Sequence, residues 1–379
     1  MEIYLDNCAT TKVCDEAVKA SVKAMTESYG NPSSLHKKGM EAEAIVNSAR
    51  KTIASVLNCD ADNIIFTSGA TESNNLAILG GINSRRRAGK TIVTDTVEHP
   101  SVSNAVAFFE KEGYKIKKVP PQKDGNFIAD DFVNAVDDDT VLLTFMMVNN
   151  ELGTVFPYEE IVRKVRKKRP DILIHIDAVQ GFTKFPLNVK KCDVDFVSFS
   201  GHKIYAPKGI GGLYIKKGIR IEPVVHGGGQ EKNLRSGTQS VPMIAGLEAA
   251  VKLCVDNKDE IAKNYKFCNE YLKKEFESIE GLVINSPENA SNHLINISVP
   301  GIPSEIMLHF LEQSEIYVSS GSACAKGEKS TVLKSAGISD ERVKSALRIS
   351  FSKDTKREEL DIFVDILKQG ITRFKSVIK

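Results

Sequence analysis

The feature that most constrains the fold is a regular alternation of short apolar runs with segments of helical spacing, beginning near residue 60. The apolar and β-branched runs lie at residues 63–66, 91–94, 141–148, 172–176, 196–199 and 212–215. Between them, apolar residues recur at helical spacing, as in residues 101–112 and 158–168. Strands that alternate with helices predict a mostly parallel β-sheet covered by helices on both faces.

The last third of the chain has a different pattern. Two long helical segments are followed by strand-like runs at residues 296–299 and 347–350 and by an amphipathic helix at residues 356–374. With 379 residues, the chain exceeds the length of one typical domain. We therefore expect a large α/β domain of residues 15–257 and a smaller α+β domain formed by residues 1–14 and 258–379.

The charge balance argues against several classes of function. The chain has 51 basic and 49 acidic residues, a formal net charge of +2, which favours neither direct nucleic-acid binding nor attraction to a membrane surface. No apolar run approaches the ~20 residues that a membrane helix needs. The N-terminus has neither the basic region nor the apolar core of a signal peptide. We therefore expect a cytoplasmic protein with no membrane association.

The seven cysteines form no Cys-x-x-Cys pair and have no histidines at ligand spacing. Neither a disulfide framework nor a metal site is expected from this pattern. Most of these thiols should be buried as small apolar side chains. Cys324 differs, because it lies in a Gly-, Ser-, Ala- and Lys-rich stretch at residues 319–330, a composition typical of a mobile loop.

A polar cluster follows each of five predicted central strands. The clusters are residues 67–72, 98–99, 149–151, 177–180 and 200–203. In open α/β sheets, ligands bind beyond the carboxyl ends of the strands. Each cluster alone is compatible with a helix cap or a turn, but five on one edge of the sheet favour a binding site.

Three of these clusters point to a particular cofactor. Residues 68–71, Ser-Gly-Ala-Thr, precede a helix and can bring backbone N–H groups close to an anion. The turn matches neither nucleotide-binding motif, so a single phosphate is the better fit. Pyridoxal phosphate needs a lysine for a Schiff base and a carboxylate for its pyridine nitrogen. Lys203 and Asp177 supply those two groups.

With these residues in place, the sequence resembles the pyridoxal-phosphate-dependent cysteine desulfurases, the NifS- and IscS-like branch of the class V aminotransferase-like enzymes. The resemblance covers essentially the whole chain. It rests on ordered motifs at residues 4–7, 29–34, 67–72, 98–99, 148–151, 177–180, 200–203, 235–238, 319–324 and 347–350. It implies the type I aminotransferase fold of pyridoxal-phosphate enzymes and a homodimer.

The resemblance also implies catalytic roles. Lys203 would form the Schiff base with the cofactor, and Asp177 would pair with the pyridine nitrogen. Gln180 would contact the ring hydroxyl, and His99 would stack on the ring and assist proton transfer. Cys324, as a thiolate, would take the sulfur of L-cysteine as a persulfide, releasing L-alanine.

The remaining implied contacts hold the phosphate and the substrate. The phosphate would be bound by Ala70, Thr71, Ser200 and His202. Thr238 would reach the phosphate of the neighbouring subunit. Arg348 and Asn150 would contact the substrate carboxylate, and Asn150 would also lie against the cofactor.

The sulfur acceptor is left open by the sequence. Residues 324–333 are slightly shorter than in the housekeeping enzymes that supply iron–sulfur scaffolds, and residues 351–354 read Phe-Ser-Lys-Asp. Both features are similar to those of desulfurases in Gram-positive bacteria that serve tRNA thiolation. The acceptor is therefore expected to be a tRNA 4-thiouridine synthase-like enzyme or an iron–sulfur scaffold.

Three other functions compete with this interpretation. A selenocysteine lyase uses nearly the same site, and a class V aminotransferase shares the cofactor residues without needing Cys324. A non-catalytic sulfur-relay adaptor would need none of the cofactor-binding and catalytic residues. The presence of Lys203, Asp177, His99 and Cys324 together argues against an adaptor.

Overall fold

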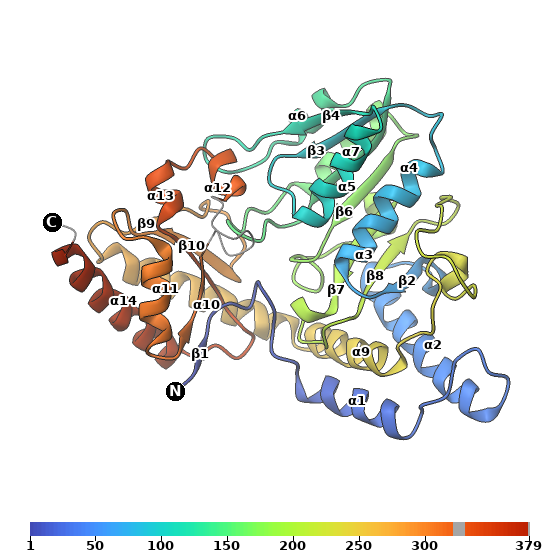
Figure 1. The fold of residues 1–379 in the computed structure, drawn as a ribbon, viewed down its shortest axis with the longest axis horizontal. Helices are drawn as coiled ribbons and strands as arrows, with labels where there is room; N and C mark the ends of the chain where they lie inside the picture. The colour runs from blue at the N-terminus through green and yellow to red at the C-terminus, as the bar shows by residue number, and fades with distance from the viewer. Residues whose placement is uncertain (321–329, 378–379) are drawn as a thin grey trace.

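The computed structural model describes residues 1–320 and 330–377. Its larger body is built on a seven-stranded sheet in the order β2-β8-β7-β6-β5-β3-β4 (Figure 1). The strands are β2 (Ile64–Thr67), β3 (Thr91–Asp95), β4 (Lys115–Val119), β5 (Thr140–Met146), β6 (Leu173–Asp177), β7 (Phe196–Ser200) and β8 (Gly211–Ile215). Only β8 runs against the others, because it pairs antiparallel with both β2 and β7. The predicted mostly parallel sheet is confirmed.

Helices cover both faces of this sheet, as the alternating pattern predicts. Because neighbouring strand residues point to opposite faces, Leu142 and Leu143 of β5 enter two different apolar clusters. One cluster contains side chains of α2 (Lys37–Leu57), α6 (Ala129–Ala135), α7 (Tyr158–Lys168) and α9 (Val241–Asp256). The other contains side chains of the π-helical segment Leu76–Gly80, of α4 (Gly81–Asn83) and of α5 (Pro100–Lys111). Helix α1 (Asp15–Thr26) packs against α9.

The smaller body contains a four-stranded antiparallel sheet in the order β12-β13-β10-β9. These strands are β9 (Val283–Ile284), β10 (Leu294–Ser298), β12 (Ser319–Ser320) and β13 (Ala346–Ser350). Helices α10 (Lys258–Glu277), α11 (Ser304–Glu312) and α14 (Arg357–Val377) supply most of the remaining apolar side chains of its own cluster. Figure 1 shows this body at the left, joined to the larger one through α10 and α9.

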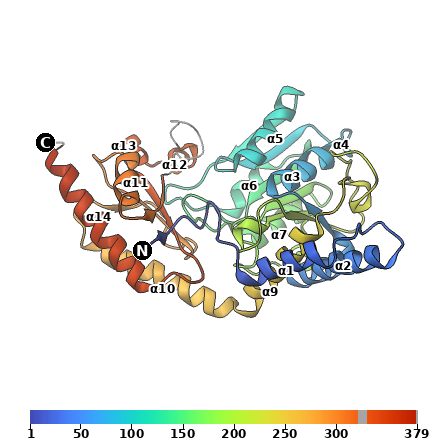
Figure 2. The ribbon, with the colours of Figure 1, turned by 60° about the horizontal axis from the view of Figure 1, so that its bottom comes forward.

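The N-terminal segment connects the two bodies. Strand β1 (Ile3–Tyr4) pairs parallel with β11 (Ile316–Tyr317), and Ile3 and Leu5 join the apolar cluster of the smaller body. The chain then crosses to the larger body, where the N–H of Thr11 donates to the carbonyl of His202 at 2.9 Å. Figure 2 shows this segment running from the smaller sheet toward α1. Residues 6–11 are called the N-terminal arm below.

The predicted boundary at residues 257 and 258 falls between α9 and α10. Helix α12 (Thr331–Ser335) belongs to the residues assigned to the smaller domain, but its side chains pack in the apolar cluster of the larger body. The two-domain division therefore stays a prediction. Three further short helices are α3 (Ala70–Asn75), α8 (Val189–Cys192) and α13 (Asp340–Lys344). Among residues 1–320 and 330–377, no helix combines the length and the apolarity needed to cross a membrane.

Candidate active site

A cavity of about 640 Å³ opens at the carboxyl edge of the large sheet. Its volume is within the range of small-molecule sites. Strand β2 points the same way as β3, β5, β6 and β7, so the polar segments after all five strands meet there. The predicted site residues that line the cavity are Ala70, Thr71, His99, Asn150, Asp177, Gln180, Ser200, His202, Lys203 and Arg348. The N-terminal arm contributes Asp6, Cys8, Ala9 and Thr10 to the wall, and β13 of the smaller body contributes Arg348.

Lys203 stands at the end of a single 3₁₀ turn, Gly201–Lys203, directly after β7. Its Nζ donates hydrogen bonds to the carbonyl oxygens of Cys8 and of Ala9, the latter at 2.8 Å. Burial, together with the cations of Arg348 and Lys184, lowers the pKa of Lys203 to about 8. A lysine amine with this pKa is neutral often enough near neutral pH to attack a carbonyl group.

Asp177 ends β6 at the base of the cavity. Its Oδ2 accepts a hydrogen bond from Asn74 Nδ2 at 2.8 Å, and its Oδ1 accepts one from the N–H of Val179 at 3.0 Å. Burial raises the pKa of Asp177, while these hydrogen bonds and the charge that His99 or Lys203 carries when protonated act to lower it. A protonated ring nitrogen placed beside Asp177 would favour the carboxylate further.

His99 is the N-cap residue of α5, and its ring stands at the open side of the cavity. The ring Nδ1 accepts from the N–H of Ser101 at 3.2 Å and lies 2.8 Å from Ser101 Oγ. Loss of hydration lowers the pKa of His99, and the Lys203 cation acts in the same direction. The imidazole is therefore neutral at pH 7 and is oriented by the helix that it caps.

Gln180 connects the N-terminal arm to a buried histidine. Its Nε2 donates to the carbonyl of Cys8 at 3.0 Å, and its Oε1 lies 3.4 Å from His293 Nε2. Burial lowers the pKa of His293 well below its usual value, with Lys184 and Arg348 adding to the effect. A neutral His293 can donate from Nε2 and so fix which way the Gln180 amide points.

Residues 68–71 form the turn that joins β2 to the first residues of α3 (Ala70–Asn75), and they line the cavity. Gly69 has a φ of 155°, which side chains other than glycine rarely allow. The first N–H groups of a helix have no partner within it and suit an anion. His202 lies nearby, and burial with the cations of Lys203 and Lys208 lowers its pKa to about 4. A neutral His202 can donate to a phosphate oxygen or accept from Thr10 Oγ1, 3.2 Å away.

Arg348 comes from β13 in the smaller body. Its Nη1 donates to the carbonyl of Asn150 at 2.9 Å, and its Nη2 donates to Asp6 Oδ1 at 2.7 Å. Its Nε is buried and has no hydrogen-bond partner among residues 1–320 and 330–377. A guanidinium has five N–H groups, so these two hydrogen bonds leave others for an additional anionic group.

The structure does not place two of the predicted residues at this cavity. Thr238 is exposed and does not line it. Cys324 lies outside the described residues, as do Lys326 and Lys329. The described cysteines form no disulfide. In the part of the chain that the structure describes, no group of three or more His, Cys, Asp or Glu side chains is placed to hold a metal ion.

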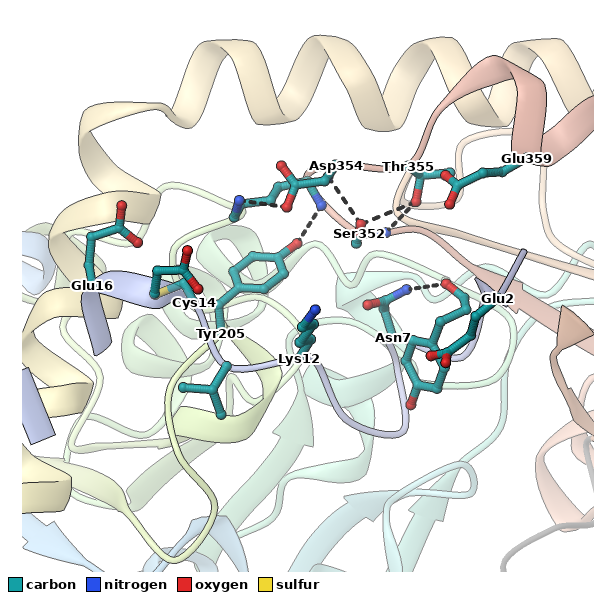
Figure 3. A pocket seen from close by; sticks show the side chains of 14 residues that line it. Glu2, Asn7, Lys12, Cys14, Glu16, Tyr205, Ser352, Asp354, Thr355 and Glu359 are labelled. Carbon is teal, nitrogen blue, oxygen red and sulfur yellow. Dashed lines mark hydrogen bonds and ion pairs between the residues drawn. The ribbon is translucent and has the colours of Figure 1, made fainter. Parts of the chain in front are cut away.

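A second cavity, of about 490 Å³, lies beside the N-terminal segment between α1 and the loop before α14. Figure 3 shows Lys12 between Tyr205 and Asn7, and Tyr205 accepting a hydrogen bond from the N–H of Lys353. None of the residues predicted for the site lines this cavity. The hydrogen bond from Lys353 to Tyr205 holds the turn that follows Lys203, and we assign this cavity no part in the reaction.

Several residues of the site were not predicted from the sequence. Cys8 and Ala9 hold Lys203, Asp6 holds Arg348, Asn74 holds Asp177, and His293 holds Gln180. Asp6 and Asn7 belong to a motif that the sequence did show, at residues 4–7. The others became visible only once the fold brought distant segments together.

The residues of the cavity fit pyridoxal phosphate. A lysine amine with a lowered pKa, a buried carboxylate and the start of helix α3 at Ala70 and Thr71 face one space. Gly211 packs directly against the turn at residues 68–71, since a Cβ on Gly211 would meet the Gly69 Cα at 2.8 Å. The absence of a side chain at residue 211 therefore lets the turn keep its position. Lys203 and Asp177 would hold the aldehyde and ring ends of the cofactor, and residues 68–71 its phosphate.

Comparison with known proteins agrees with this geometry. Residues 3–363 match the family Aminotransferase class-V. The chain is 38% identical to a NifS/IcsS protein homolog of Lactobacillus delbrueckii subsp. bulgaricus, over 99% of this chain and 98% of that one. It is 36% identical to the cysteine desulfurase IscS of Methanosarcina thermophila, over 99% and 93% of the two chains.

Solved structures give the same answer. A NifS-like protein superposes with a TM-score of 0.93 at 36% identity, over 98% of this chain and 100% of that one. A structure described as SspA in complex with cysteine superposes with a TM-score of 0.81 at 32% identity, over 93% and 99%. The chain therefore belongs to the class V aminotransferase family and, within it, to the pyridoxal-phosphate-dependent cysteine desulfurases of the IscS and NifS type.

Proposed function

We propose that this enzyme converts L-cysteine to L-alanine and passes the sulfur, held as a persulfide on Cys324, to an acceptor protein. The observation that carries the proposal is the Arg348 guanidinium, which lines the same cavity as Lys203 and Asp177 and keeps further N–H groups beyond those that bind Asn150 and Asp6. A guanidinium donor without a partner suits the α-carboxylate of an amino acid. Relatives named cysteine desulfurase and a neighbour solved with cysteine support cysteine as that amino acid.

Each residue of the cavity can be given a task in this reaction. Arg348 and Asn150 bind the carboxylate and so orient the Cα–H bond of the substrate. Lys203, once released as a free amine, moves the α-proton, which its pKa of about 8 allows. Bound pyridoxal phosphate supplies the electron sink that weakens the Cα–H and Cβ–S bonds. Asp177 keeps positive charge at the ring nitrogen, and neutral His99 can accept or return a proton.

The sulfur step needs a thiolate at the cavity. Cys324 lies between Ser319, which lines the cavity, and Ser330, whose Oγ donates to Glu151 Oε2 at 2.6 Å. Both described ends of the intervening segment are therefore close to the substrate contacts. We assign to Cys324 the attack on the substrate sulfur, which forms an S–S bond as the Cβ–S bond breaks. The bonding pair stays on Cβ, which takes a proton, and alanine leaves.

Two parts of the proposal concern partners. We assign the enzyme to a homodimer in which the exposed Thr238 of one protomer reaches the phosphate held by the other. The acceptor is either a tRNA 4-thiouridine synthase-like enzyme or an iron–sulfur scaffold. Transfer of labelled sulfur from the loaded enzyme to each purified acceptor separates these two.

The experiment that tests the function measures alanine and sulfide released from L-cysteine in the presence of a thiol reductant, with Lys203→Ala as the control. Equimolar alanine and sulfide from the wild type, and neither from Lys203→Ala, is the expected result. Release from L-selenocysteine alone would indicate a selenocysteine lyase. An aminotransferase would yield a 2-oxo acid in place of alanine when an amino acceptor is supplied.

A further inference from the structure

A buried ion pair lies at the edge of the large sheet, outside the cavity. Arg50 of α2 and Glu231 are both buried, and they form two hydrogen bonds, of 2.9 Å from Nη1 to Oε2 and 2.7 Å from Nη2 to Oε1. The Glu231 carboxylate also accepts from Gln239 Nε2. A charged pair taken out of water needs such additional partners to be stable, and this one has them.

The pair binds the outer edge of β2. Glu231 Oε2 accepts from the N–H of Phe66 at 2.8 Å, and Arg50 Nη1 donates to the carbonyl of Ile64. Strand β2 is the last strand of the sheet on this side, so these backbone groups have no neighbouring strand. The ion pair takes the place of that strand. Because β2 ends at Thr67 and leads directly into residues 68–71, the ion pair fixes the strand from which that turn begins.

The segment that carries Glu231 is strained. Glu231, Lys232 and Asn233 have φ angles of 46°, 60° and 63°, so three consecutive residues with side chains adopt the left-handed conformation. This conformation is unfavourable for each of them and persists only where surrounding contacts impose it. In Figure 1 this segment belongs to the yellow loops at the right of the larger body. The strain of this segment and the burial of Glu231 indicate that its position matters.

The same segment leads to a second contact, with the turn itself. Arg235 Nε donates to Glu72 Oε1 at 2.7 Å, and Glu72 Oε2 accepts from the N–H and the Oγ of Ser68 at 2.8 and 2.6 Å. Although burial acts to raise it, the hydrogen bonds from Arg235 and Ser68 hold the pKa of Glu72 below its usual value. Glu72 lines the cavity, so its negative charge would repel a phosphate unless Arg235 neutralised it.

We propose that Arg50, Glu231, Arg235 and Glu72 are positioning residues that hold residues 68–71 in the geometry required by the cofactor phosphate. The proposal rests on the assignment of that turn to the phosphate under Proposed function. Arg50 and Glu231 act through β2, on one side of the turn. Arg235 acts through Glu72, on the other side, and cancels its charge.

The test compares two ligands that differ only in the phosphate, pyridoxal phosphate and pyridoxal. Removing one partner of a buried ion pair is strongly destabilising. A variant of Arg50 or Glu231 could therefore fail to fold. The decisive variant is Arg235→Gln, because the Arg235 side chain is 26% exposed and its loss should be tolerated. Its affinity for pyridoxal phosphate, from visible absorbance, should fall about tenfold, the loss expected for one charged contact. Its affinity for pyridoxal should stay within about twofold of the wild type.

Glu231→Gln should lose affinity for the phosphorylated ligand in the same selective way. The control is Glu160→Gln, which removes an exposed ion pair with Lys164 on α7 and should change neither affinity. Equal losses for both ligands, or no loss in Arg235→Gln, would overturn the proposal. A wild type that binds the two ligands equally would instead overturn the assignment of residues 68–71, whatever the variants show. Neither result depends on whether L-cysteine is the substrate.

Discussion

The amine of Lys203 should titrate far below an ordinary lysine. With a pKa of about 8 rather than 10.5, about 9% of the amine is neutral at pH 7, against about 0.03% for an ordinary lysine. This is about a 300-fold difference in the reactive form. The cause is burial, to which the cations of Arg348 and Lys184 add, and the charges of Cys8 and Asp6 offset it only in part.

The assay is the rate at which the cofactor-free full chain recombines with pyridoxal phosphate, followed by visible absorbance from pH 7 to pH 10. A simple amine measured in parallel corrects for titration of the cofactor itself. The corrected rate should rise about tenfold between pH 7 and pH 9, with half of the rise near pH 8, and then level off. A rate that keeps rising about tenfold for each pH unit up to pH 10 would refute the argument, because it would show an ordinary amine.

Three further changes have defined outcomes. Arg348→Gln should raise the KM for L-cysteine by about 10- to 100-fold, because losing one charged hydrogen bond weakens binding by about that factor, and kcat should change little. An unchanged KM would exclude Arg348 from carboxylate binding. Asp177→Asn should bind pyridoxal phosphate, seen as visible absorbance, yet lower kcat about 100-fold or more in the alanine assay; near-wild-type turnover would contradict its role at the ring nitrogen. Thr183 has a φ of 64°, so Thr183→Gly should stabilise the chain by about 0.5–1 kcal/mol in urea unfolding while Thr183→Ala should not; a less stable glycine variant would show that the conformation carries no strain.

The sequence predicted the elements whose pattern is set by burial. Helix α7 spans Tyr158–Lys168, the range that the apolar spacing indicates, and β5 differs from the predicted run only at its ends. The edge strand β4 was missed, because three lysines in Lys115–Val119 weaken its apolar pattern. Helices α1 and α2 were also missed, since no strand-like run precedes them to mark an alternation. The helical segment after β2 contains a π-helical turn at Leu76–Gly80, which no local sequence pattern indicates.

The site was predictable where it follows the strands and hidden where it depends on long-range contacts. Asp177 and Lys203 stand at strand ends, so their meeting at one edge follows from the topology alone. The contacts of Lys203 with Cys8, and of Arg348 with Asp6, join residues that are 195 and 342 positions apart. They exist because β1 pairs with β11 and carries the N-terminal arm across the cavity. Nothing in the local sequence encodes that pairing.

The most direct test of the central claim is the intact mass of the enzyme after one equivalent of L-cysteine is added without a reductant. We expect the wild type to release one equivalent of alanine and to gain the mass of one sulfur atom, located by peptide mapping on Cys324. Cys324→Ala should bind L-cysteine but gain no sulfur. Alanine released by Cys324→Ala at the wild-type rate, or sulfur found on another cysteine of the wild type, would contradict transfer through Cys324.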